Sequence, residues 1–168
     1  MPGDVNEPLA AASGDAGVRV DAFTGALIES NVLGSHATLF TDPGAVQRNQ
    51  AGVASVGGSN GIVRNNLIGF GRVTGVNLIS GSTGWAVSGN EIRDSGMDTA
   101  DGDGITVDAS PMNTASGNLI TGSSSQSFAV TMAGATGNTF TNNTVPGKGV
   151  GITSGLVQSA GVIRRSGA

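Results

Sequence analysis

The stretches Asn65-Asn66-Leu67-Ile68, Gly89-Asn90-Glu91-Ile92 and Gly117-Asn118-Leu119-Ile120 repeat one pattern, in which an aliphatic residue follows an asparagine two positions later. The same pattern returns at Ser30-Asn31-Val32-Leu33 and at Asn142-Asn143-Thr144-Val145. Its asparagines lie 35, 24, 28 and 25 residues apart. A period in the twenties is typical of a solenoid, in which each repeat forms one coil that stacks on its neighbours.

A second pattern stands 14 to 16 residues before most of these asparagines and alternates apolar with polar residues. Examples are Gly17-Val18-Arg19-Val20, Gly75-Val76-Asn77-Leu78 and Gly104-Ile105-Thr106-Val107. Alternation with a period of two predicts half-buried strands. We therefore predict an all-β solenoid of about six coils with three short strands each. Its strands would form three parallel sheets with coils about 4.8 Å apart.

The two ends of the chain depart from the repeat. Residues 1–16 form a separate N-terminal segment or cap, with a short helical turn predicted over Asn6–Ala12, and residues 17–168 form the solenoid domain. The last repeat begins at Gly149 and loses the asparagine. Because a solenoid leaves unpaired strand edges at its ends, we expect further repeats or end-to-end stacking of copies there.

The repeated asparagines predict a structural ladder in which amides stack from coil to coil and also make the turns, because asparagine tolerates a left-handed backbone. Its members are Asn31, Asn66, Asn90, Asn118 and Asn143. The residues two positions later predict one buried column, made of Leu33, Ile68, Ile92, Ile120 and Val145.

Composition excludes several classes of function. The net charge of −4 argues against nucleic acids and anionic membranes as partners. The chain has no cysteine, no apolar run long enough to span a membrane and no visible secretory signal at Met1.

These repeats resemble right-handed parallel β-helix proteins of the pectate-lyase-like superfamily, and most nearly secreted bacterial surface proteins of that fold. The resemblance covers roughly residues 17–163. It implies an extracellular or cell-surface location and a groove along the outer face of one sheet, walled by the loops that enter it. Carried onto this chain, the ligand-binding positions of that groove are Arg19, Asp21, Asn77, Thr106, Asp108 and Thr131.

The loop between residues 94 and 103 carries the densest group of carboxylates. Asp98, Asp101 and Asp103 are a candidate calcium site, although a solvated acidic loop is the alternative interpretation.

Other residues are candidates for catalysis or sugar binding. Arg48 and Arg93 would matter to a lyase only if they lie beside these aspartates. His36 has no identifiable catalytic partner, and Trp85 is either a packing residue or a platform for a sugar ring.

From these observations we expect a structural or adhesive surface module that binds glycans and needs no cofactor, with calcium as an optional ligand. The alternative is a polysaccharide lyase or glycoside hydrolase, or a fragment of one, acting on an acidic glycan. The sequence assigns no catalytic residue, because paired aspartates at a loop occur commonly without catalysis.

Overall fold

The computed structural model describes residues 16–35, 39–98, 102–122, 126–133, 136–146 and 149–152. Within these ranges the side chains of residues 102, 126–129, 132 and 149–152 are not described. The helical turn predicted over Asn6–Ala12 lies outside the described residues, and the first strand starts at Ala16. Among the described residues no helix has the length and apolar character needed to cross a membrane.

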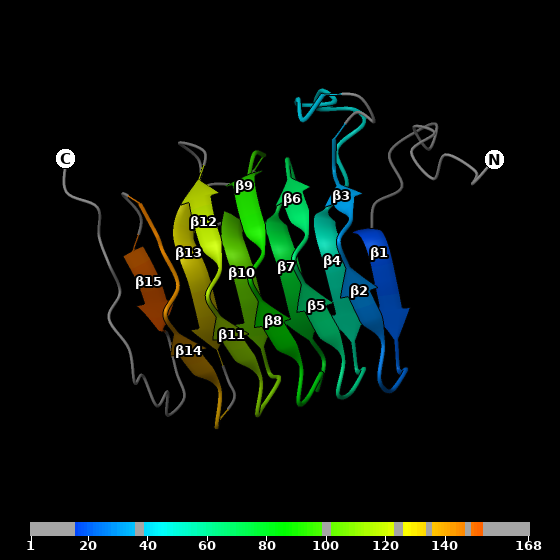
Figure 1. Ribbon diagram of the computed structural model, residues 1–168, viewed down its shortest axis with the longest axis vertical. Coiled ribbons are helices and arrows are strands. Elements are labelled where there is room, and N and C mark those ends of the chain that lie inside the picture. Colours follow the sequence, from blue (N-terminus) through cyan, green and yellow to red (C-terminus); the bar gives the residue numbers. More distant parts are fainter. Residues whose placement is uncertain are drawn as a thin grey trace.

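The strands stack into three parallel sheets, which Figure 1 shows as a single row from β1 at one end to β15 at the other. The first sheet contains β1 (Ala16–Asp21), β4 (Ala51–Val56), β7 (Thr74–Ile79), β10 (Gly102–Asp108), β13 (Gln126–Ala133) and β15 (Gly149–Ile152). The second contains β2 (Leu27–Glu29), β5 (Ile62–Arg64), β8 (Ala86–Ser88), β11 (Thr114–Ser116) and β14 (Thr139–Thr141). The third contains β3 (Val32–Leu33), β6 (Leu67–Gly69), β9 (Glu91–Ser95) and β12 (Leu119–Gly122).

This topology confirms the predicted parallel β-helix. Each strand pairs in parallel with the corresponding strand of the next coil, for example Ile68 opposite Ile92 and Ile120 opposite Ile92. The first four coils each contribute three strands, as predicted. In the fifth coil the third strand is reduced to one bridge between Leu119 and Thr144, and β15 is the described part of the sixth coil.

Three columns of inward side chains, one from each sheet, make up most of the core, which also contains Leu78, Val107 and Trp85. The residues of the three columns are 0% to 4% exposed: Val53, Val76, Ile105 and Val130; Val63, Val87, Ala115 and Phe140; Ile68, Ile92, Ile120 and Val145. The third column is the one predicted from the sequence, with Leu33 only partly buried at its end. Full burial of such a side chain contributes about 1.5–3 kcal/mol, so this periodic core is the main source of stability.

The turn before each ladder asparagine differs from the prediction. The left-handed residue is the one that precedes the asparagine, with φ between 53° and 64° at Ser30, Asn65, Gly89, Gly117 and Asn142. The ladder asparagines themselves do not have positive φ. The physical reason is the orientation of the asparagine side chain, which must point into the corner of the coil to form its hydrogen bonds with the neighbouring coils. The residue before it therefore reverses the chain.

The five ladder asparagines are joined along the stack by side-chain hydrogen bonds. Each Nδ2 donates to Oδ1 of the next asparagine, over 3.1, 3.0, 3.0 and 2.8 Å from Asn31 to Asn143. Each backbone N–H donates to the same oxygen. From Asn66 onward, Nδ2 also donates to a carbonyl of the preceding coil, such as Val87 O from Asn118. These last four asparagines are 1% or 2% exposed.

A second, shorter polar column surrounds Trp85 at another corner. Trp85 is 1% exposed and its Nε1 donates to Gly58 O over 3.0 Å, so the structure decides for packing and against a sugar platform. Oδ1 of Asn113 accepts from the Trp85 backbone N–H, and Oδ1 of Asn138 accepts from that of Asn113, both over 2.8 Å. Our prediction missed this column, although the 25-residue spacing of the two Asn-Thr pairs was a usable signal.

Candidate functional site

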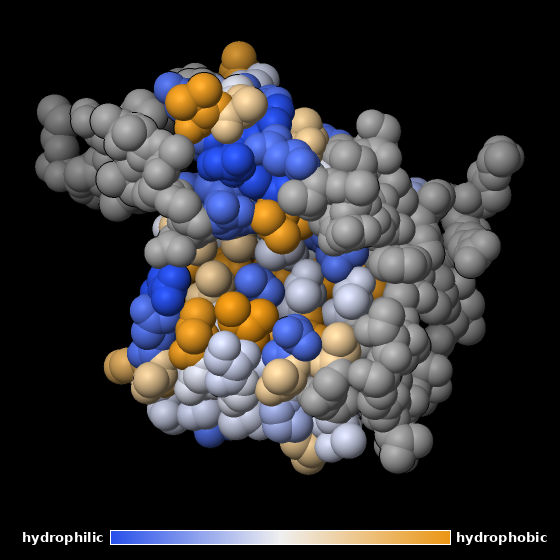
Figure 2. Space-filling view, turned by 180° about the vertical axis from the view of Figure 1, so that it is seen from behind, coloured by the Kyte–Doolittle hydropathy of each residue, from blue (hydrophilic) through white to orange (hydrophobic). Residues whose placement is uncertain are grey.

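The outer face of the first sheet carries the predicted groove residues in two rows. One row is in register across the coils, with Arg19 opposite Ala54, Ala54 opposite Asn77, Asn77 opposite Thr106 and Thr106 opposite Thr131. We call Arg19, Asn77, Thr106 and Thr131 the polar row. Figure 2 shows the side of the molecule that faces away in Figure 1, with polar and apolar residues mixed below a hydrophilic patch.

The other two predicted groove residues stand outside the polar row. Asp21 is opposite Val56, which is in turn opposite Ile79. Asp108 is exposed and stands opposite Ala133. Apolar and small residues thus interrupt this second row. The six predicted positions share one face, and four of them stand in one register, in which Ala54 separates Arg19 from the three adjacent residues Asn77, Thr106 and Thr131.

At the first-coil end of the polar row, Arg19 and Asp21 form an ion pair. Nε of Arg19 lies 2.9 Å from both carboxylate oxygens of Asp21, and the side chains are 40% and 57% exposed. An ion pair this exposed contributes little to stability. Its effect on the site is that positive charge at this end of the row is balanced within the same strand.

The centre of the row lies beside a buried carboxylate. Asp103 is 5% exposed and stands opposite Thr74 in the adjacent strand. Oγ1 of Thr106 lies 3.3 Å from both Oδ2 of Asp103 and Oγ1 of Thr74. Because the Thr106 hydroxyl has a single proton, it can donate to one of these oxygens at a time. The prediction did not include Thr74, which becomes part of the site only through strand register.

The far end of the row is less accessible than predicted. Oγ1 of Thr131 is shielded from solvent, and among the residues that the structure describes it has no hydrogen-bond partner. The polar groups that the row presents to solvent are therefore mainly those of Arg19, Asn77 and Thr106.

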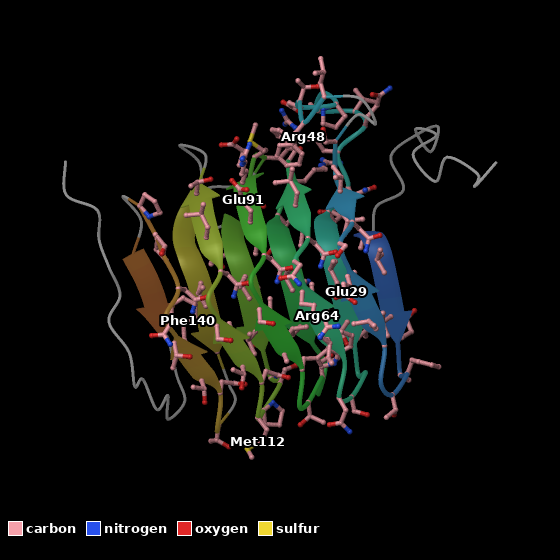
Figure 3. The ribbon with its side chains drawn as sticks, viewed as in Figure 1. Glu29, Arg48, Arg64, Glu91, Met112 and Phe140 are labelled. Carbon is pink, nitrogen blue, oxygen red and sulfur yellow. The ribbon has the colours of Figure 1, made fainter. Side chains whose placement is uncertain are left out.

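A network of four charges borders this face, where the chain enters the strands of the first sheet. Arg48 donates from Nε and Nη2 to the two oxygens of Asp42, over 2.9 and 2.5 Å, and from Nη1 to Oδ1 of Asp98 over 2.6 Å. Nε of Arg72 donates to Oδ2 of Asp98 over 2.7 Å. The Arg48 side chain is only 12% exposed. We call these four residues the charged network, and Figure 3 shows Arg48 on the loop beyond the strand ends.

The charged network holds the carboxylate of Asp42 in its ionised form. The hydrogen bond from Arg48 is the largest cause and lowers the pKa of Asp42 below 3.8, its ordinary value. The same bond raises the pKa of Arg48. The network therefore links the long loop after β3 to the turns that follow β6 and β9 by charge-assisted bonds.

An aromatic contact fixes the same loop at a second point. The rings of Phe40 and Phe70 lie 5.0 Å apart between centroids, and the Arg93 guanidinium lies 5.4 Å from the Phe40 centroid. Arg93 also donates to Glu91 over 2.7 Å. Arg93 is thus a packing residue at the third sheet, whereas Arg48 does lie beside one of the predicted aspartates.

The structure leaves the predicted calcium site as a prediction. Asp101 lies outside the described residues, as does His36. Asp98 is already bound by two guanidinium groups, and Asp103 is buried beside Thr106. Within the described ranges no three His, Cys, Asp or Glu residues form a group that could hold a metal ion.

Comparisons with known proteins cover most of the chain. The family described as "right handed beta helix region" matches residues 11–158. The crystal structure of an alginate lyase from Paenibacillus sp. str. FPU-7 is similar, with a TM-score of 0.62 and 16% sequence identity. The match covers 83% of this chain and 47% of that one, so this chain spans about half the length of that protein. At this identity the likeness shows the fold alone. No curated protein sequence matches the chain.

Proposed function

Because the chain belongs to the right-handed beta helix family, we propose that it is an extracellular or cell-surface module, structural or adhesive in role, that binds a polysaccharide. The observation that carries the proposal is the polar row, in which successive coils place Asn77 and Thr106 directly side by side on an outer face. A β-helix repeats such groups along its axis at the strand spacing of about 4.8 Å. A linear polymer with repeated hydroxyl groups is the ligand that fits a linear series of hydrogen-bonding side chains.

We further propose that the long loop after β3, which carries Asp42 and Arg48 of the charged network, forms a wall beside this face. Arg48 and Phe40 fix the loop from two sides, so a ligand would meet a surface that needs little further ordering. The structurally similar alginate lyase acts, by its name, on a polysaccharide, which supports this class of ligand. Calcium bound by Asp98, Asp101 and Asp103 remains an optional part of the proposal.

A binding experiment tests this proposal directly. Affinity electrophoresis against soluble neutral and acidic polysaccharides should show retardation of the wild type. Asn77→Ala and Thr106→Val should each weaken binding by about fivefold, and together by about thirtyfold, since each removes hydrogen bonds of about 1 kcal/mol. Thr114→Val on the second sheet is the matched control and should bind as the wild type does. Equal binding by all three variants would show that the polar row is not the site.

An enzyme acting on an acidic glycan is the second candidate, and Asp103 favours it. A carboxylate that is 5% exposed and lies beside the polar row is placed where a base could act on a bound sugar. The charged network offers no such base at Asp42 or Asp98, because both carboxylates accept hydrogen bonds from arginines.

A titration of calcium against the melting temperature of the protein, with magnesium as control, tests the optional calcium site. No shift at millimolar calcium would leave the solvated-loop interpretation.

A further inference from the structure

The proton of the Thr106 hydroxyl is directed into the protein. Oγ1 of Thr106 is the donor toward two oxygens, Oδ2 of Asp103 and Oγ1 of Thr74, each 3.3 Å away. Asp103 and Thr74 are 5% and 1% exposed and stand opposite each other near the start of β10 and β7. A hydroxyl has a single proton, so whichever of the two oxygens receives it, that proton points toward a buried group.

Thr74 cannot reverse the direction of this hydrogen bond. Its own hydroxyl proton is donated to Val76 O over 3.1 Å within the same strand. A hydroxyl whose proton is already donated can only accept, and an ionised carboxylate also only accepts. Thr106, which is half-buried on the outer face, therefore has two acceptors as neighbours. The lone pairs of its Oγ1 atom are what it offers to a partner outside the protein.

The charges around Thr106 have the same preference. Asp108 is exposed on the same outer face two residues further along β10, and Asp103 lies within hydrogen-bond distance of the Thr106 hydroxyl. Two residues of a strand span roughly 6.6 Å, so a group bound at Thr106 lies close to both carboxylates. Two such carboxylates attract a group that donates hydrogen bonds and repel an anionic one.

We propose that Thr106 selects hydrogen-bond donors, so that the ligand of the polar row is a neutral polysaccharide with a free hydroxyl group donating to Thr106 Oγ1. Asp103 and Thr74 are positioning residues, because they act on the ligand only by fixing the Thr106 proton. This ligand class rests on the proposed function, since it applies only if the polar row is the binding site. A carboxylate or an ether oxygen placed at Thr106 would meet lone pairs and negative charge.

Matched derivatives of one polymer test the direction of this hydrogen bond. The probes are a β-glucan, a galactomannan and a xylan, each unmodified, partly O-methylated and partly carboxymethylated, in affinity electrophoresis with the full chain. O-Methylation removes donors and leaves every oxygen as an acceptor. The wild type should bind the unmodified form of the polymer that retards it at least about fivefold more tightly than the methylated form, because one hydrogen bond is lost. The carboxymethylated form should bind more weakly still at low salt.

Two substitutions at Thr106 separate the effect of the hydrogen bond from that of the methyl bulk. Thr106→Ser keeps the hydroxyl and should keep the preference for the unmodified polymer. Thr106→Val keeps the size of the side chain and should reduce that preference by about fivefold.

A charge substitution tests the positioning residue. Asp103→Asn should raise the affinity for the carboxymethylated polymer by about fivefold at low salt, which the loss of a merely structural side chain would not do. The matched control is Asp94→Asn, which removes the same charge from β9 in the third sheet and should leave both preferences unchanged. An unchanged affinity of Asp103→Asn for the carboxymethylated polymer would contradict the role given to Asp103.

The outcomes distinguish the ligand class from the proposed function. If no polymer retards the wild type, or if Asn77→Ala and Thr106→Val weaken binding to none, the polar row is not the site and the proposed function fails. If the row binds, but the methylated or carboxymethylated form binds as tightly as the unmodified one, only the ligand class is wrong. Equal preferences in Thr106→Ser and Thr106→Val would also overturn it, because the Thr106 hydroxyl would then not select the ligand.

Discussion

Replacing Asn118 by alanine should destabilise the protein by about 3 kcal/mol. The Asn118 side chain takes part in four hydrogen bonds, accepting from the backbone and side chain of Asn90 and donating to Val87 O and to Asn143 Oδ1. The Nδ2 group of Asn90 keeps its bond to Val63 O, and Asn143 Oδ1 keeps the one from the Asn118 backbone. The backbone N–H of Asn90, however, loses its acceptor in a corner where Asn90 is 1% exposed. That orphaned donor costs about 1–3 kcal/mol, and the other lost bonds add to it.

Urea unfolding, followed by circular dichroism, measures this cost. The matched control is Asn142→Gly, because Asn142 occupies the corresponding turn of the next coil, is exposed and has a φ of 53°, which glycine adopts freely. The control should unfold within about 0.5 kcal/mol of the wild type. A cost below about 0.5 kcal/mol for Asn118→Ala, or an equal cost for both variants, would refute the reasoning that the buried amides support one another.

Three further predictions follow from other parts of the structure. Gly61→Ala should cost about 1–3 kcal/mol and change the fluorescence of Trp85, because the added methyl group would overlap its ring; an unchanged melting temperature would contradict this. At pH values above 3.8, the ordinary pKa of Asp42, the Asp42–Arg48 bond should hold the long loop in place. As the pH falls through the lowered pKa of Asp42, the carboxylate is protonated and the loop should be released. Limited acid proteolysis near Phe40 should therefore rise at low pH in the wild type, and Asp42→Asn should be cleaved readily at every pH. Finally, the chain alone should not cleave pectate, alginate or chondroitin with calcium present. New unsaturated or reducing ends that disappear in Asp103→Ala would establish the enzyme instead.

The sequence alone was sufficient for the fold because a β-helix repeats its constraints in every coil. Each asparagine is followed at a fixed distance by an aliphatic residue, so five copies of one weak signal identify the buried column that ends at Ile120 and Val145. The alternation around Val76 and Ile105 likewise placed the first sheet and its outward residues. These are local properties, since period-two burial depends on neighbouring positions in one strand.

Only the tertiary structure decided which residues form a site. Arg48 meets Asp98 across 50 residues and Arg72 meets Asp98 across 26, and no local pattern predicts either contact. The burial of Asp103, the shielding of the Thr131 hydroxyl and the packing of Trp85 also depend on what neighbouring coils place above each residue. The physical reason is that the period of the strand determines which face a side chain takes. The register between coils and the path of the long loop then determine what that side chain contacts there.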